Sequence, residues 1–116
     1  MDDSLQFRVW DRKLKKFSYF NLFNSLPAYQ NEEEYIVFRC TGITDRNDNL
    51  IFEGDILFKG GLHYEVKWSS GRFLATCPNY CHYHWPTFKY FESETISSLL
   101  VGNIMEHGFL LEKKRA

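Results

Sequence analysis

Apolar and polar residues alternate with a period of two in several short stretches of the chain. The clearest stretch is 62–68, in which His63, Glu65 and Lys67 are separated by larger apolar residues. Such alternation predicts a strand with one face in the core and the other in solvent. Further strands are predicted at 5–10, 17–20, 35–40, 56–58 and 72–76, with a return of the chain to the core at 50–52.

Turn-forming residues separate these stretches. The charged segment 11–16 joins the first two predicted strands in a hairpin, and the segments 59–61 and 69–71 form two further tight turns. Thr41 and Gly42 interrupt the apolar run that ends at Cys40, so the third strand is expected to stop there, and a polar loop is expected at 44–49.

The remaining segments are less regular. Residues 21–34 are rich in turn formers and end in a short acidic run. The segment 77–86 is rich in cysteine, histidine and aromatic residues, and it is predicted to lead into an extended segment that runs to Phe91. A helical turn or a bend is expected at 92–95, and a closing strand at 101–105, in which Gly102 marks a bulge or a close backbone contact. Many short strands and no long helix predict a mainly β protein, a small antiparallel β-barrel.

Composition narrows the class of protein further. The chain has 116 residues, enough for one domain, and a net charge of −1 with both signs spread along it. Aromatic residues make up 18% of the chain, which suits the core of a small β domain. No apolar run is long enough to span a membrane and no secretory signal is evident, so a cytoplasmic protein is expected, with free thiols at its three cysteines.

The segment Glu53-Gly54-Asp55 lies between two apolar stretches and is the point around which the chain is arranged. Gly54 is expected to have a positive φ in a sharp turn, and the two carboxylates to accept hydrogen bonds from its backbone N–H groups. The same carboxylates, with Glu65 as a further candidate, are the nearest approach to an acid–base pair. A role in the turn is favoured, and no catalytic residue is assigned.

Cysteine and histidine residues are concentrated between positions 77 and 84. Two thiolates and two imidazoles are the ligands that Zn²⁺ prefers, but these residues are crowded within eight positions, and a strand would point some of them apart. Free thiols and exposed histidines are favoured, and no cofactor is assigned. The zinc candidates are Cys77, Cys81, His82 and His84.

Basic and aromatic residues on the predicted strands offer a surface for single-stranded nucleic acid, because bases stack on aromatic rings. Net charge near zero argues against this partner. Arg8 and Asp11 are expected to form a structural ion pair at the first hairpin. The candidate nucleic-acid contacts are Arg8, Lys13, Lys67, Trp68 and Arg72, with Trp10 beside them.

Four segments resemble motifs of the YopX-like proteins of phages and prophages. They are Phe7-Arg8-Val9-Trp10-Asp11, Thr41-Gly42-Ile43 with Asp45 and Asn47, Ile51-Phe52-Glu53-Gly54-Asp55-Ile56, and Val101-Gly102-Asn103-Ile104-Met105-Glu106. Two positions depart from the pattern: Asn49 stands where a glycine is common, and His107-Gly108 replaces Asn-Pro. The motif residues expected to be structural are Trp10, Asp11, Thr41, Gly42, Glu53, Gly54, Asp55, Gly102 and Asn103.

The resemblance implies an SH3-like β-barrel with an N-terminal β-hairpin extension, encoded by a phage or prophage and located in the bacterial cytoplasm. It implies one YopX-like domain over 1–116, divided into a hairpin and irregular segment (1–40), a barrel core (41–106) and a tail (107–116). It implies no activity.

Three functions remain open from the sequence. The favoured one is a non-enzymatic accessory module that binds a protein partner or itself. The first alternative is a protein that binds single-stranded nucleic acid, and the second is a small zinc protein that uses the cysteine–histidine cluster.

Overall fold

The computed structural model describes residues 6–21, 34–77, 84–85 and 88–111. Nine strands, one α-helix and one 3₁₀-helix lie within these ranges. They are β1 (Gln6–Asp11), β2 (Lys16–Asn21), β3 (Tyr35–Thr44), β4 (Leu50–Phe52), β5 (Asp55–Lys59), β6 (Leu62–Ser69), β7 (Arg72–Thr76), β8 (His84–Trp85), α1 (Phe88–Thr95), β9 (Leu99–Asn103) and η3 (Gly108–Leu111).

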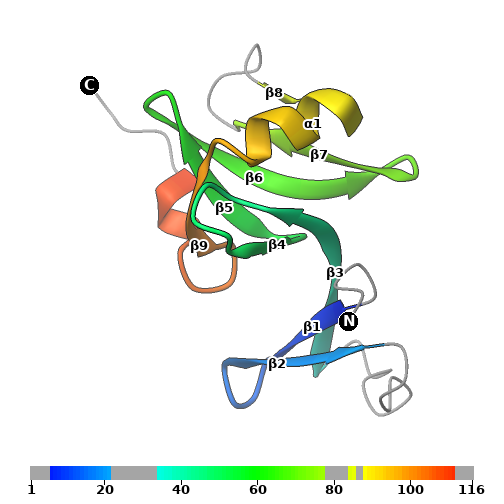
Figure 1. Cartoon of the computed structure of the whole chain (residues 1–116). Helices are drawn as coiled ribbons and strands as arrows, with labels where there is room; N and C mark the ends of the chain where they lie inside the picture. The colour runs from blue at the N-terminus through cyan, green and yellow to red at the C-terminus, as the bar shows by residue number, and fades with distance from the viewer. Residues whose placement is uncertain (1–5, 22–33, 78–83, 86–87, 112–116) are drawn as a thin grey trace.

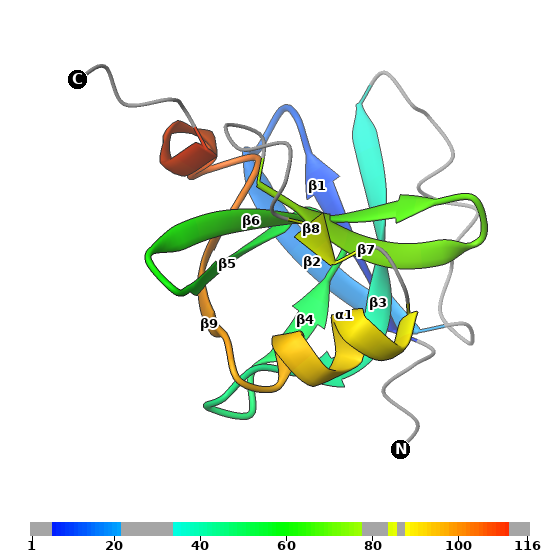
Figure 2. The same ribbon diagram turned by 90° about the horizontal axis from the view of Figure 1, so that it is seen from above.

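The strands form two antiparallel sheets. The first has the order β2-β1-β3-β4 and the second the order β8-β7-β6-β5-β9. β3 is the longest strand, and in Figure 1 it runs from the β1–β2 hairpin up to the second sheet. Seen from above, the strands curl around the core, with β6 on one side and α1 on the opposite side (Figure 2). The mainly β, barrel-like fold predicted from the alternation is confirmed.

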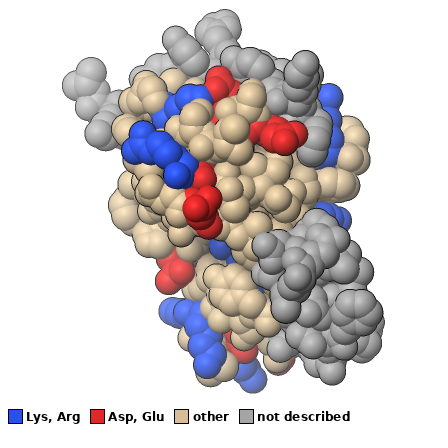
Figure 3. Space-filling model, in the orientation of Figure 1, with Lys and Arg blue, Asp and Glu red and all other residues tan. Residues whose placement is uncertain are grey.

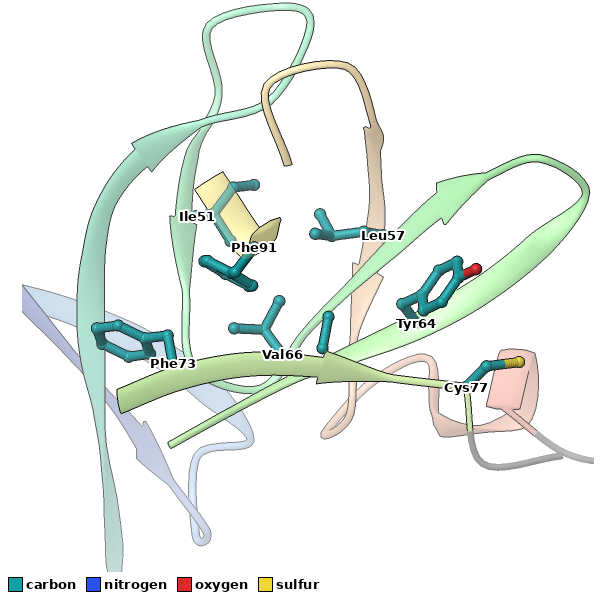
Figure 4. Packing of buried hydrophobic residues seen from close by; sticks show 8 residues of the cluster. Ile51, Leu57, Tyr64, Val66, Phe73, Cys77 and Phe91 are labelled. Carbon is teal, nitrogen blue, oxygen red and sulfur yellow. The ribbon is translucent and has the colours of Figure 1, made fainter. Parts of the chain in front are cut away.

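The core lies between the second sheet and α1. Ile51, Leu57, Val66, Ala75 and Phe91 have no exposed surface, and Figure 4 shows the Phe91 side chain directed from the helix toward Val66 and Ile51. Tyr64, Phe73 and Cys77 complete the buried cluster. The alternation at 62–66 therefore placed Tyr64 and Val66 correctly in the core.

Two expectations about local structure are wrong. The segment before Phe91 is not wholly extended, because residues 88–95 form α1. The third strand does not stop at Cys40 but continues to Thr44, with a shift in its register against β4. Gly42 adopts a φ of +75° within that irregular part, so it bends the strand without ending it.

Other local predictions agree with the structure. The hairpin turn follows β1, and Asp11 accepts hydrogen bonds there from the N–H groups of Lys13 (2.9 Å) and Leu14 (3.0 Å). Gly102 lies at a register shift between β9 and β5, and a Cβ at this position would be 2.7 Å from the His107 side chain. Both expectations for Gly102, a bulge and a close contact, are met together. None of the described helices is long and apolar enough to cross a membrane.

Candidate functional site

The turn at Glu53–Asp55 connects the two sheets. Gly54 has a φ of +86°, as predicted, and its N–H donates to the Val66 carbonyl (2.8 Å) in β6. Its own carbonyl accepts the Ile104 N–H at 2.8 Å. An added Cβ at Gly54 would lie 3.0 Å from the Phe38 ring, so the backbone approaches β3 closely. The turn therefore holds β3, β6 and the segment after β9 in one place.

The two carboxylates of the turn point to different environments. Asp55 is buried, and its Oδ2 accepts the Phe52 N–H at 2.7 Å. Glu53 is partly exposed, and its Oε1 accepts the N–H of Arg39 at 3.3 Å. The prediction that the carboxylates accept N–H groups of the turn therefore holds for Asp55, beside Phe52, whereas the N–H that Glu53 accepts belongs to β3. Because Asp55 and Glu53 do not face one cavity, they do not form an acid–base pair.

Arg8 is the buried partner of Asp55. Its Nη2 lies 2.7 Å from Asp55 Oδ1 and donates to the Glu53 carbonyl at 3.1 Å. Its guanidinium carbon lies 4.4 Å from the centre of the Phe17 ring, with two further phenyl rings, those of Phe38 and Phe52, at 5.5 and 5.1 Å. The first and third motifs of the sequence thus meet in one ion pair.

The positions of Arg8 and Trp10 contradict two expectations from the sequence. Arg8 is 5% exposed and forms its ion pair with Asp55 rather than with Asp11. It therefore neither belongs to an ion pair at the hairpin turn nor offers a surface contact for nucleic acid. Trp10 is 7% exposed and packs edge-on against Phe17 at 4.8 Å, so it lies in the core. Burial raises the pKa of Asp55 to about 6, although Arg8 and the Phe52 N–H oppose this shift.

A pocket of about 240 Å³ opens on the outer side of the same turn. Three parts of the chain that are far apart in sequence line it: β3, the turn before β5, and β6, with one residue from the segment after β9. The lining residues are Phe38, Glu53, Gly54, Glu65, Val66, Lys67, Trp68 and Ile104. Apolar side chains from these elements are combined with two carboxylates and one ammonium group.

Arg39 borders this pocket, although it was not among the candidate site residues from the sequence. Its guanidinium carbon lies 5.0 Å from the centre of the Trp68 ring, and its Nη1 lies 3.1 Å from Glu53 Oε1. Trp68 is 38% exposed and also packs edge-on against Phe73 at 4.7 Å. No local pattern in the sequence could pair Arg39 of β3 with a tryptophan in β6.

Glu65 is the second carboxylate of the pocket. It lies in β6, is partly buried, and forms no ion pair with any described residue at 4.0 Å or less. Burial raises the pKa of Glu65, and the nearby Lys67 charge opposes this shift. The two carboxylates of the pocket therefore differ, since Glu53 has a cationic partner in Arg39.

The structure brings together only part of the predicted nucleic-acid surface. Lys67 and Trp68 share the pocket, whereas Lys13 lies in the β1–β2 turn, 3.8 Å from Glu34, and Arg72 lies at the exposed start of β7. On the face shown in Figure 3, the described acidic and basic side chains are interspersed. The described residues visible there form no continuous basic surface.

The metal candidates are only partly described. Cys77 is a buried free thiol in the core cluster, and Cys40 is also buried, with its Sγ accepting the Gly42 N–H at 3.3 Å. Cys81 and His82 lie outside the described residues, as does the side chain of His84. Within the described ranges, no three cysteine, histidine, aspartate or glutamate side chains are grouped closely enough to hold a metal ion.

The other motif residues make hydrogen bonds that join loops to strands. Thr41 Oγ1 donates to the Ile51 carbonyl at 2.7 Å, which joins β3 to β4. Asp45 accepts hydrogen bonds from Asn47 and Asn49 in its own loop and from the Leu100 N–H (2.8 Å) in β9. Asn103 Oδ1 accepts two N–H groups of the following turn, from Met105 and Glu106. These hydrogen bonds connect β3 with β4, the Asp45 loop with β9, and β9 with the turn that follows it.

Fold and site together define a small, mainly β protein with two curled antiparallel sheets and an open pocket at the turn that joins them. The family model described as "YopX protein" matches residues 26–112, so the chain belongs to the YopX family. No curated protein sequence matches the chain.

A solved structure shares the fold. The crystal structure of protein EF1440 from Enterococcus faecalis is similar over 92% of this chain and 97% of that one, with a TM-score of 0.60 and 23% sequence identity. At this level of identity the likeness concerns the fold, and it carries no function over.

Proposed function

We propose that this protein is a non-enzymatic accessory module, encoded by a phage or prophage, that binds a protein partner at the pocket around Trp68. The observation that carries the proposal is the exposed Trp68 ring, stacked against Arg39 at 5.0 Å beside an apolar pocket. Tryptophan and arginine are enriched among the residues that contribute most to protein–protein binding. Such residues usually lie in a pocket that the partner covers.

The composition of the pocket favours a protein over a nucleic acid. Its two carboxylates, Glu53 and Glu65, would repel phosphates, and Arg39 is the ion-pair partner of Glu53 alone. Single-strand binding relies instead on a positively charged groove that follows the backbone. A mixed surface with an apolar floor is typical of a protein interface.

The same arrangement supports a non-enzymatic role. Catalysis by two carboxylates needs both groups in one cavity with different pKa values. Glu53 and Glu65 do line one pocket, but Glu53 is held by Arg39 at 3.1 Å. The residues that line the pocket include no serine, cysteine or histidine that could act with these carboxylates, which favours recognition over catalysis.

Selection of peptides on the purified protein tests the proposal. Peptides enriched from a random display library are measured for binding to the unaltered protein, Trp68→Ala and Leu14→Ala by fluorescence polarisation. Leu14 is the matched control, because it is an exposed apolar residue (63%) that does not line the pocket. We expect Trp68→Ala to weaken binding roughly thirtyfold and Leu14→Ala to leave it unchanged.

Equal affinity for Trp68→Ala and the unaltered protein would reject the pocket as the binding site. Native mass spectrometry of the same sample separates the alternatives. A multiple of the 13.9 kDa mass would favour self-assembly, and one bound zinc would favour the cysteine–histidine cluster. Salt-sensitive binding of an oligonucleotide that is lost in Trp68→Ala would favour the nucleic-acid function.

A further inference from the structure

We infer that the partner places a basic side chain, arginine or lysine, in the pocket against the carboxylate of Glu65. This inference rests on the proposed function and specifies the chemistry of the partner. It follows from the difference between the two carboxylates of the pocket, since Glu53 already has a cationic partner and Glu65 has none among the described residues.

The charge of Glu65 is only partly balanced. Lys67 is the basic residue that affects it most, and it is exposed and forms no ion pair with Glu65 at 4.0 Å or less. Burial raises the pKa of Glu65, and the charge of Lys67 only partly opposes this shift. An incoming cation would supply the missing counter-charge, and an incoming carboxylate would add a second buried anion.

The shape and lining of the pocket suit a long basic side chain. Ile104 and the exposed Trp68 ring offer apolar surface for the methylene groups of such a side chain. Aromatic rings attract cations over their faces, most strongly for tryptophan. A volume of about 240 Å³ accommodates one side chain of this kind, but not a folded element.

The protein already contains one example of the same contact. The guanidinium of Arg39 lies over the Trp68 ring and bonds with Glu53. Trp68 and Glu53 therefore recognise an arginine from within the chain. Glu65, which lines the same pocket, offers a second carboxylate to an arginine or lysine from outside.

Substitutions within the selected peptides test this inference. Each basic residue of a pocket-binding peptide is replaced in turn by citrulline, for arginine, or by norleucine, for lysine. These replacements keep length and remove charge. We expect one replacement to weaken binding about tenfold, and Glu65→Gln to weaken binding of the unaltered peptide by a similar factor.

A matched control separates a specific pair from general charge attraction. Glu92 is exposed and lies on α1 outside the pocket, so Glu92→Gln removes the same charge without altering the site. We expect Glu92→Gln to leave the affinity unchanged. We also expect the charge-neutral peptide to bind Glu65→Gln no more weakly than it binds the unaltered protein, because the lost contact is the same one.

The results that would overturn this inference differ from those that would reject the proposed function. Peptides that depend on Trp68 but contain no basic residue, or that bind Glu65→Gln as tightly as the unaltered protein, would leave the pocket as a binding site and reject the basic anchor. Peptides that ignore Trp68 altogether would reject the pocket itself.

Discussion

At the scale of single residues, the ion pair of Arg8 and Asp55 links the N-terminal hairpin to the turn below the pocket. The two side chains are almost fully buried, with their charged atoms 2.7 Å apart. Two buried charges stabilise a fold only when each satisfies the other, and removal of one leaves the second without compensation. The side-chain Nε of Arg8 has no hydrogen-bond partner among the described residues. Asp55 is the acidic residue that balances the charge of the Arg8 guanidinium.

Asp55→Asn should therefore destabilise the protein by about 3 kcal/mol, because Asn can still accept the Phe52 N–H but cannot balance the Arg8 charge. The double variant Arg8→Met with Asp55→Asn should recover part of this loss, since it removes the uncompensated charge. Urea unfolding of the two single variants and the double variant measures the coupling. Simple addition of the two single losses would show that the pair has no energetic role.

Asp45 gives a pH-dependent prediction with a definite sign. Burial acts to raise the pKa of Asp45, but hydrogen bonds from Leu100, Asn49 and Asn47 together hold it below its ordinary value of 3.8. Because the folded pKa is the lower one, the contribution of Asp45 to stability is present above pH 3.8 and is lost as the pH falls through the folded pKa. In Asp45→Asn, an NH₂ group replaces one of the two carboxylate oxygens and faces N–H groups that this oxygen accepted.

We expect Asp45→Asn to lower the free energy of unfolding by about 2 kcal/mol at neutral pH, and this difference from the unaltered protein to shrink as the pH falls below 3.8. Denaturant midpoints of both proteins between pH 7 and pH 3 provide the comparison. A difference that is the same at every pH would show that the charge of Asp45 does not contribute.

At the scale of the elements, the strands followed from alternation, whereas α1 did not. The aromatic residues of Phe88-Lys89-Tyr90-Phe91 have high strand propensity, which favoured an extended segment. The helix exists because it covers the open side of the core, where Phe91 is fully buried. This is a tertiary effect that overrides the local preference of the sequence.

The end of α1 carries a second, local prediction. Thr95 and Ser98 are both fully buried, but Ser98 donates its hydroxyl to the Thr95 carbonyl at 2.7 Å, whereas the Thr95 hydroxyl has no hydrogen-bond partner in the described structure. A buried hydroxyl without a partner is a penalty that an apolar group of the same shape avoids.

Thr95→Val is therefore expected to raise the free energy of unfolding by about 1 kcal/mol, and Ser98→Ala to lower it by about the same amount. Thermal and urea unfolding of the two variants check the pair, with each serving as the control for the other. A loss of stability in Thr95→Val comparable to that in Ser98→Ala would mean that the Thr95 hydroxyl is bonded in solution.

At the scale of the whole molecule, the site depends on contacts that no local pattern contains. Glu53-Gly54-Asp55 was predictable as a turn, because a glycine between two acidic residues and two apolar stretches has few other interpretations. The partners of that turn were not predictable. Arg8 is 47 positions from Asp55, and Arg39 is 29 positions from Trp68. Alternation indicates which side chains share a face of a strand, but not which strand will lie opposite.

The surface of the molecule also depends on long-range contacts that the sequence does not reveal. The sequence showed a net charge near zero, which argued against nucleic acid, and the structure adds that the two signs meet within one pocket. Trp68 was placed on the apolar side of β6, where its neighbours Tyr64 and Val66 are buried, yet it is 38% exposed at the end of the strand. Because Trp68 lies near the end of β6, a binding partner can reach its ring.

The most direct test of this account is an NMR titration of the ¹⁵N-labelled protein with one of the peptides selected on it, in which the backbone amides that change are mapped onto the structure. We predict that the largest shifts fall together at 38–39, 53–54, 65–68 and 104, the four segments that meet only at the pocket. Shifts confined to the β2 edge, to α1 or to η3, with the pocket amides unchanged, would contradict the assignment of this pocket as the binding site.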